Sequence, residues 1–508
     1  MLSASLTLDP AFRVAPVGRR LFGSFVEHMG RCVYSGIYDP GHPAADGRGF
    51  RGDVLELVRE LGVGVVRYPG GNFVSGYRWE DGVGPDRPTR LDLAWRQVEP
   101  NTFGLGEFMA WTRAAGVEPM LAVNLGTRGI QEACDLLEYA NHPGGSYWSD
   151  LRVRHGDAEP YGIKLWCLGN EVDGPWQIGH KSAAEYGRLA AETAKAMRAL
   201  DPDVELVLCG SSGAGMPTFG AWEATVLEAA YDAVDHISLH AYYEEQGDLA
   251  SLLASPAAMD RFIADVVATA DHVRAKLGRS KRITLSFDEW NVWNMSRFAG
   301  RTQAPFEHAP ELIEDTYTLA DAVAVGGYLI TLLRNADRVA IACQAQLVNV
   351  IAPIRTDPGG PAWRQTIFHP FALTARHARG EVLRVEPTGP VLNTAAHGEV
   401  PALDAVATHD PETGAVSLFA VNRHLTEPLT LHADVRALGE IRRTGAQIIA
   451  GPDPHAVNDR ANPDRVLPRP LEVPPPEDGR LTLTLPPVSW GVVTLARPRV
   501  LSMDTVAR

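Results

Sequence analysis

Between residues 20 and 380, short apolar runs recur, each followed by a loop and an amphipathic stretch. No other pattern in the chain restricts its fold as strongly, because a strand, a helix and a second strand form a parallel βαβ unit with a right-handed crossover. Eight such units over about 360 residues fit a (β/α)8 TIM barrel with insertions better than an open doubly wound sheet. The runs predict strands at Leu21–His28, Val63–Pro69, Pro119–Leu125, Ile163–Asn170, Glu205–Gly210, Asp235–Tyr242, Ile283–Glu289 and Val339–Val348.

The stretches between these runs carry helix signals. Ser182 and Glu185 form a capping box, which opens a helix predicted to bury Tyr186, Leu189, Thr193, Met197 and Leu200. The same spacing follows Asp53 and covers residues 316–334. Within the latter, Ala322–Leu333 is apolar but only twelve residues long. A bilayer span needs about 20 residues, so a buried helix is expected and not a membrane anchor.

After residue 380 the pattern changes to short strand-like runs separated by turn residues, such as 415–421, 429–433 and 481–485. An antiparallel β-sandwich is expected there, with the proline-rich segment 453–478 as a long surface loop. The segment Ala4–Leu8 alternates like a strand and is expected to join the sandwich. The predicted organisation is therefore an α/β fold with a (β/α)8 barrel over residues 18–380 and a C-terminal sandwich domain of residues 381–508 plus 1–17.

Composition excludes several classes of protein. Hydrophobic residues make up 45% and charged residues 21%, as in soluble globular proteins. The net charge of −15 argues against nucleic acid as a partner. Five cysteines without CxxC spacing predict neither a disulfide framework nor a cysteine zinc site. The first 20 residues show no signal-peptide pattern, so a cytoplasmic location is expected.

Two glutamates follow strongly apolar runs at the end of a barrel strand, the face on which barrel enzymes react. Glu171 follows the fourth run and Glu289 ends the seventh. Paired carboxyl groups across a barrel mouth are what glycoside hydrolysis requires, one as proton donor and one as nucleophile or base. The alternative for any single glutamate is a solvated or salt-bridged side chain.

The surrounding motifs make the chain resemble the α-L-arabinofuranosidases of glycoside hydrolase family 51. The segments that carry the resemblance are Gly169-Asn-Glu-Val-Asp-Gly-Pro-Trp-Gln177 with Gly179-His180, Asp288-Glu-Trp-Asn-Val-Trp293, Gly23-Ser-Phe-Val-Glu27-His28, Arg67-Tyr-Pro-Gly-Gly-Asn72-Phe, Ser238-Leu-His-Ala-Tyr242 and Gln344-Ala-Gln346-Leu-Val-Asn349. They run through the whole barrel in the family's order.

The resemblance implies a retaining, exo-acting enzyme with Glu171 as acid/base and Glu289 as nucleophile. It also implies that Glu27, Asn72, Asn170, Tyr242 and Gln346 hold the arabinofuranosyl ring. Asn170 is placed to bond the sugar 2-OH, and Tyr242 to donate to Glu289 and favour its ionised form. Without the family resemblance, other roles fit these residues equally well. Glu27 would be a salt-bridged or solvated carboxylate and Gln346 a polar residue bonded to a neighbouring backbone. Asn72 would be a turn residue and Tyr242 a core aromatic.

Several functional alternatives remain open from the sequence. An endo-acting β-glycanase on the same barrel and a non-catalytic carbohydrate-binding protein are the rivals. Trp176 and Trp293 read either as sugar platforms or as barrel-mouth packing. No paired-histidine metal motif is present, so no metal or other cofactor is expected. The expected partner is an arabinose-containing oligosaccharide derived from arabinan or arabinoxylan, and the family implies a homo-oligomer, often a hexamer.

Overall fold

A computed structural model describes residues 2–299 and 306–497 and contains a closed barrel of parallel strands. Every run predicted to be a barrel strand contributes one, so the predicted barrel is confirmed. The strands are β3 (Gly23–Phe25), β4 (Val65–Tyr68), β7 (Glu118–Ala122), β8 (Leu165–Cys167), β9 (Glu205–Leu208), β10 (His236–Tyr243), β11 (Thr284–Val292) and β13 (Val339–Gln344). Around the barrel their order is β10-β11-β13-β3-β4-β7-β8-β9, so β13 closes the ring against β3.

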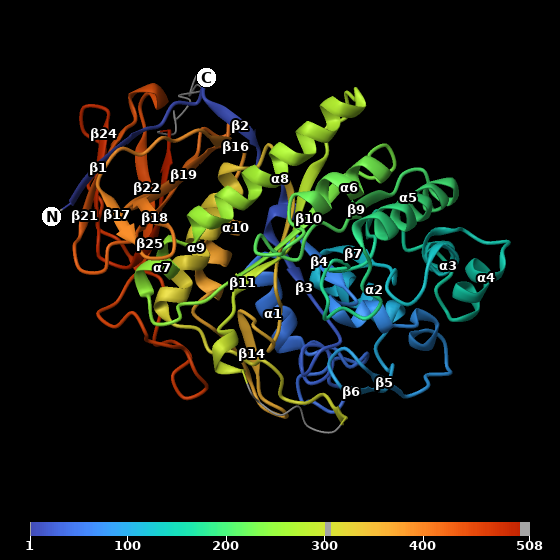
Figure 1. The fold of residues 1–508 in the computed structure, drawn as a ribbon. Coiled ribbons are helices and arrows are strands. Elements are labelled where there is room, and N and C mark those ends of the chain that lie inside the picture. The colour runs from blue at the N-terminus through green and yellow to red at the C-terminus, as the bar shows by residue number, and fades with distance from the viewer. Residues whose placement is uncertain (1, 300–305, 498–508) are drawn as a thin grey trace, which may run out of the picture.

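Helices surround the barrel (Figure 1). They are α1 (Gly52–Leu61), α2 (Leu105–Ala115), α3 (Ile130–Asn141), α4 (Tyr147–Arg154), α5 (Ala183–Leu200), α6 (Ala221–Ala230), α7 (Leu249–Ala254), α8 (Pro256–Leu277), α9 (Leu319–Arg334) and α10 (Phe368–His377). Helix α5 begins at the predicted capping box, in which the Ser182 hydroxyl accepts from the Glu185 amide. The prediction was wrong for Leu200, which is 43% exposed, because the helix ends there at the protein surface.

Two sheets form the sandwich at the other end of the molecule. The larger one has the order β2-β16-β19-β20-β25-β22-β23 and the smaller one β1-β21-β24. Pairing is antiparallel except between β1 and β21, which are parallel. The strands are β1 (Leu2–Thr7), β2 (Arg13–Pro16), β16 (Glu381–Leu383), β19 (Leu403–His409), β20 (Val416–Asn422), β21 (Leu429–Asp434), β22 (Arg442–Ile449), β23 (Arg469–Pro470), β24 (Arg480–Leu485) and β25 (Ser489–Ala496).

Small strands outside both sheets complete the chain. A three-stranded sheet joins β12 (Glu307–His308), β6 (Gln97–Glu99) and β5 (Arg90–Asp92), and hairpins are formed by β14 (Ile354–Thr356) with β15 (Ala362–Arg364) and by β17 (Val391–Thr394) with β18 (Gly398–Pro401). The β5–β6 hairpin belongs to the long connection between β4 and α2, at the carboxyl end of the barrel.

Helix α9 joins the two parts of the molecule. It lies between the barrel and the sandwich in Figure 1, and nearly every residue in it is buried, as expected for Ala322–Leu333. A Cβ at Gly326 would lie 2.2 Å from a ring atom of Trp490 in β25. The segment 453–478 is not wholly a surface loop, since Ala456 accepts from the Leu319 amide at the start of α9 and is itself buried.

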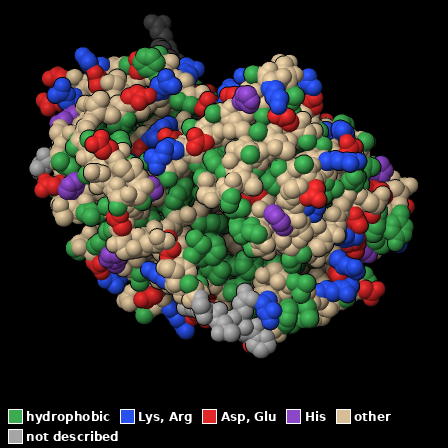
Figure 2. Space-filling model, viewed as in Figure 1, with side chains coloured by type: hydrophobic (Ala, Val, Ile, Leu, Met, Phe, Trp, Pro, Cys, Tyr) green, Lys and Arg blue, Asp and Glu red, His purple; other side chains and the backbone are tan. Residues whose placement is uncertain are grey.

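Charged side chains dominate the rim of the face shown in Figure 2, whereas apolar side chains gather in its hollowed middle. None of the helices in the described part of the chain has the length and apolar character that crossing a membrane requires.

Candidate active site

The first glutamate, Glu171, is presented by a tight turn after β8. The strand ends at Cys167, and the chain turns through Gly169, with φ 95°, and Glu171, with φ 43°. A residue with a side chain rarely adopts positive φ, which costs on the order of 1–3 kcal/mol and occurs most often at functional sites. The turn aims the Glu171 carboxyl over the barrel mouth, where Oε2 accepts from Trp176 Nε1 at 2.8 Å.

The second glutamate, Glu289, lies inside β11 and not at its end, because the strand continues to Val292. Arg67 Nη1 donates to Oε1 at 2.8 Å and the Tyr242 hydroxyl donates to Oε2 at 2.6 Å. Burial alone would raise the pKa of Glu289. The positive charges of His240 and Arg67 and the hydrogen bond from Tyr242 outweigh burial, so its pKa is lowered. The surroundings of Glu289 therefore favour its ionised form.

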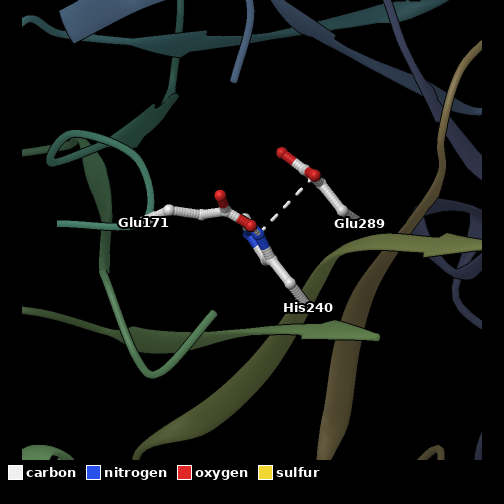
Figure 3. A group of neighbouring side chains, drawn as sticks. All are labelled: Glu171, His240 and Glu289. Atoms are coloured by element: carbon white, nitrogen blue, oxygen red, sulfur yellow. Dashed lines mark hydrogen bonds and ion pairs between the residues drawn. The ribbon is translucent and has the colours of Figure 1, made fainter. Parts of the chain in front are cut away.

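His240, on β10, lies between the two glutamates, which approach it from opposite sides (Figure 3). Its Nδ1 is 2.8 Å from Glu171 Oε1 and 3.6 Å from Glu289 Oε2. One oxygen of each glutamate and this nitrogen all lie within 4.8 Å of one another. Burial disfavours the charged imidazole, but the negative charge of Glu289 and the hydrogen bond to Glu171 raise the pKa of His240. A single side chain is thus coupled to both carboxyl groups.

A further buried carboxyl group, that of Glu27, lines the cavity just after β3. Its Oε1 accepts from the Phe73 amide at 2.9 Å and from Trp95 Nε1 at 2.8 Å. Its Oε2 accepts from Gln346 Nε2 at 3.0 Å. Burial raises the pKa of Glu27 to about 8 despite these donors. Glu27 and Gln346 both lie two residues beyond the paired part of their strands, β3 and β13, since the chain leaves the barrel there to form the cavity wall.

Two asparagines link this wall to the catalytic pair. Asn170 Oδ1 accepts from Arg67 Nη2 at 2.6 Å, and Asn170 Nδ2 is 3.4 Å from Asn72 Oδ1. Gly71 precedes Asn72, and a Cβ there would lie 3.0 Å from Glu289 Oε1. A side chain at position 71 would therefore crowd the Glu289 carboxylate.

These side chains surround one cavity of about 710 Å³. The residues predicted for the site that line it are Glu27, Asn72, Glu171, Tyr242, Glu289 and Gln346. Asn170 is joined to them by the hydrogen bonds above. Trp176 and Trp293, whose roles were open from the sequence, also line the cavity, and the Trp293 ring packs edge-on against Tyr242 at 5.1 Å between centroids.

Two residues of the site, Arg67 and His240, were not predicted from the sequence. Arg67 is completely buried in β4, bonded to Glu289 and Asn170, with its Nε 3.8 Å from Asp288 Oδ2. An arginine inside an apolar run was the available signal, because a buried guanidinium requires anionic partners. For His240 the available signal was its place two residues before Tyr242 on the same strand, which makes both side chains point the same way.

A parallel barrel that holds an ionised carboxylate and a second, hydrogen-bonded carboxyl group in one cavity at its carboxyl end defines the class of glycoside hydrolases. Comparison with known proteins supports the assignment to the glycoside hydrolases. Residues 57–285 match the α-L-arabinofuranosidase 1 domain and residues 288–489 match the α-L-arabinofuranosidase C-terminal domain.

Relatives match over nearly the whole chain. An intracellular exo-α-(1→5)-L-arabinofuranosidase from Streptomyces lividans is 58% identical over 98% of this chain and 76% of its own. An exo-α-(1→6)-L-arabinofuranosidase from Bifidobacterium longum is 52% identical over 96% of both chains. A solved family 51 α-L-arabinofuranosidase from Bifidobacterium longum superposes with a TM-score of 0.94 at 50% identity, covering 97% of this chain and 99% of that one. The chain belongs to the α-L-arabinofuranosidases of glycoside hydrolase family 51.

Proposed function

We propose that the protein is a retaining, exo-acting α-L-arabinofuranosidase that releases terminal arabinofuranosyl residues. The observation that carries this proposal is the short separation of the two carboxyl groups, with oxygens of Glu171 and Glu289 within 4.8 Å. Retaining enzymes have carboxyl groups about 5–5.5 Å apart, whereas inverting enzymes need about 6.5–9.5 Å to admit a water molecule. Within family 51, this spacing favours attack by one carboxylate on the sugar.

Glu289 is the proposed nucleophile, since Arg67 and Tyr242 stabilise its ionised form. It attacks the anomeric carbon while Glu171 protonates the departing oxygen. A covalent glycosyl-enzyme results, and Glu171, now ionised, takes a proton from the water that hydrolyses it. His240 Nδ1 faces both glutamates, so its hydrogen bonds can follow the negative charge as it moves from one carboxyl group to the other.

The arabinofuranosyl ring is proposed to bind against Glu27, Asn72, Asn170, Tyr242 and Gln346. Trp95 supports exo action, because it lies in the β5–β6 hairpin, lines the cavity and donates to Glu27. This hairpin is proposed to close one end of the cavity. A covered end accommodates a chain terminus, whereas an endo-acting glycanase needs a groove open at both ends. A non-catalytic sugar-binding protein would not need both glutamates in hydrogen-bonded positions.

The names of the relatives share exo action on α-L-arabinofuranosyl units but differ in linkage, (1→5) in one and (1→6) in another. We therefore propose oligosaccharides derived from arabinan or arabinoxylan as substrates, without assigning one linkage. Several relatives carry intracellular in their names, which supports a cytoplasmic location for this protein. A homo-oligomer, as the family resemblance implies, is expected in sedimentation velocity, and a monomer at micromolar concentration would contradict it.

Release of free arabinose from 4-nitrophenyl α-L-arabinofuranoside tests the function most simply. The xylopyranoside and glucopyranoside with the same leaving group are the matched comparisons. Preference for the arabinofuranoside is expected. Failure to release arabinose, or equal rates on all three glycosides, would reject the proposed activity.

No metal is proposed, although Glu171, His240 and Glu289 are close enough to hold one. His240 Nδ1 is already hydrogen-bonded to Glu171, and both Glu289 oxygens accept from other side chains. Dialysis against EDTA should therefore leave kcat/KM unchanged. A loss of activity that a divalent cation restores would show that the three residues bind a metal.

A further inference from the structure

The polar residues proposed to hold the sugar ring and one group of apolar residues lie on opposite arcs of the barrel. Glu27, Asn72 and Gln346 follow β3, β4 and β13, which are adjacent strands. The other side follows β8, β9 and β10, also adjacent, and is formed by Trp176, Ala214 and Tyr243 together with Ala258 and Phe262 of α8. We call these last five residues the apolar slot.

The apolar slot lies on the side of Glu171. Trp176 bonds the Glu171 carboxyl directly, and Ala214 and Tyr243 lie at the carboxyl ends of β9 and β10, the next two strands around the barrel from β8, which Glu171 follows. The acid/base of a glycosidase must reach the leaving oxygen, so the group attached to that oxygen leaves toward the slot. Its position follows from the role proposed above for Glu171.

The walls of the slot are fixed before any ligand binds. Phe262 packs edge-on against Phe219 and Phe287, with centroids 5.3 and 6.1 Å away. Tyr243 stacks on Tyr328 at 4.8 Å. Ala258 is four residues before Phe262 on α8 and so lies on the same helix face. A preformed apolar wall gains affinity for an apolar surface with little reorganisation.

The described lining of the cavity offers no free cation to an anionic leaving group. Among the described residues that line it there is no lysine or arginine. The positive groups nearest to it are already bonded, Arg67 to Glu289 and Asn170 and His240 Nδ1 to Glu171. A carboxylate on the leaving group would therefore enter beside the ionised Glu289 without a partner, which disfavours binding.

We infer that the apolar slot selects arabinofuranosides whose leaving group is uncharged and presents an extended apolar surface, such as an aryl or a fused-ring alcohol, and rejects those carrying a carboxylate. This deepens the proposed function and rests on it. Phe262 and Ala258 are then specificity-determining residues for the leaving group and not for the arabinose ring.

The first test narrows the slot. Ala258→Leu should lower kcat/KM for 4-methylumbelliferyl α-L-arabinofuranoside relative to methyl α-L-arabinofuranoside by about tenfold or more, since only the larger leaving group reaches α8. Ala264→Leu, the same change on an exposed position of α8, is the matched control and should not move this ratio. An unchanged ratio in Ala258→Leu, or an equal loss on both substrates, would overturn the assignment.

The second test adds a charge to the rim. The wild-type enzyme should prefer 3-(methoxycarbonyl)phenyl over 3-carboxyphenyl α-L-arabinofuranoside by about tenfold or more. Ala214→Lys, at an exposed loop position, should reduce that preference, and Ala214→Gln should not. Because each result is a ratio between arabinofuranosides, absence of activity on all of them would refute the proposed function, whereas activity without discrimination would refute only the slot.

Discussion

At the scale of single residues, the two oxygens of Glu289 are divided between a cation and a hydroxyl. Arg67 donates to one and Tyr242 to the other. Burial raises the free energy of a carboxylate unless both oxygens are bonded. The lowered pKa of Glu289 is thus produced by named partners, and each can be removed separately.

Tyr242→Phe should move the acidic limb of the kcat/KM profile to higher pH. Loss of the hydroxyl raises the pKa of Glu289, so the nucleophile becomes protonated at a pH where the wild-type residue is still ionised. A hydrogen bond to a charged group is worth about 1.5–3 kcal/mol, which corresponds to a shift of about one pH unit or more. Tyr161→Phe, which removes a hydroxyl donating to Asp157 at 2.6 Å outside the cavity, should leave the profile in place. An unshifted limb in Tyr242→Phe would show that this hydrogen bond does not govern the nucleophile.

Asn72→Ala and Gln346→Ala should fold normally and lose transition-state stabilisation, measured as kcat/KM. Loss of one hydrogen bond to a neutral sugar hydroxyl corresponds to about 0.5–1.5 kcal/mol. The loss should be larger for Gln346, because Glu27 also loses a donor. Gln131→Ala, whose side chain bonds Asp135 on an exposed face of α3, serves as the control. Wild-type kinetics in both cavity variants would remove these residues from the sugar-binding site.

At the scale of elements, the alternation of apolar runs and amphipathic stretches predicted the barrel, because this alternation can be recognised whatever the length of the loops between the elements. Strand ends were less predictable. Glu27 and Gln346 read as strand residues, yet they lie beyond β3 and β13, since apolar character continues where backbone pairing stops. Arg67 and His240 were not predicted for a related reason. Their partners lie far away in the sequence, Glu289 for Arg67 and both Glu171 and Glu289 for His240, and a local pattern does not identify such partners.

Helix α9 shows what periodicity cannot predict. The helical spacing over 316–334 predicts the helix, and the apolar run Ala322–Leu333 predicts that it is buried. Neither pattern identifies the cover, which is the sandwich packed on the face that a barrel helix normally exposes. The boundaries at residues 18 and 380 remain a prediction about domains, although the sandwich sheets do include β1 and β2.

Gly326→Ala should lower the thermal unfolding midpoint, although alanine favours a helix over glycine by about 1 kcal/mol. The added methyl would lie 2.2 Å from Trp490 Cδ1, so the indole or the helix must move. Overpacking of this kind costs about 1–3 kcal/mol. Gly47→Ala, where nothing lies within 4 Å of the new Cβ, should change the midpoint little. A stabilised Gly326→Ala variant would mean that α9 and β25 are less tightly packed than described.

At the scale of the whole molecule, the barrel supplies two carboxyl groups from β8 and β11 to one cavity, and their different surroundings assign them different roles. The neighbours of Glu289 stabilise its ionised form. Glu171 lies on a strained turn, and its carboxyl group is hydrogen-bonded to Trp176 and His240. The proposed mechanism depends on this division of roles between the two residues.

Replacing each glutamate by alanine, with a 2,4-dinitrophenyl α-L-arabinofuranoside as substrate, separates the role of nucleophile from that of acid/base. Glu171→Ala should form the glycosyl-enzyme, because this leaving group needs little protonation, and then stall for lack of a base. Azide needs no base, so it should restore turnover and give an arabinosyl azide with the substrate's anomeric configuration. Glu289→Ala should be inactive even on this substrate, and any azide product should have the opposite configuration. Identical responses of the two variants, or the reverse pattern, would contradict the assignment of Glu289 as nucleophile and Glu171 as acid/base.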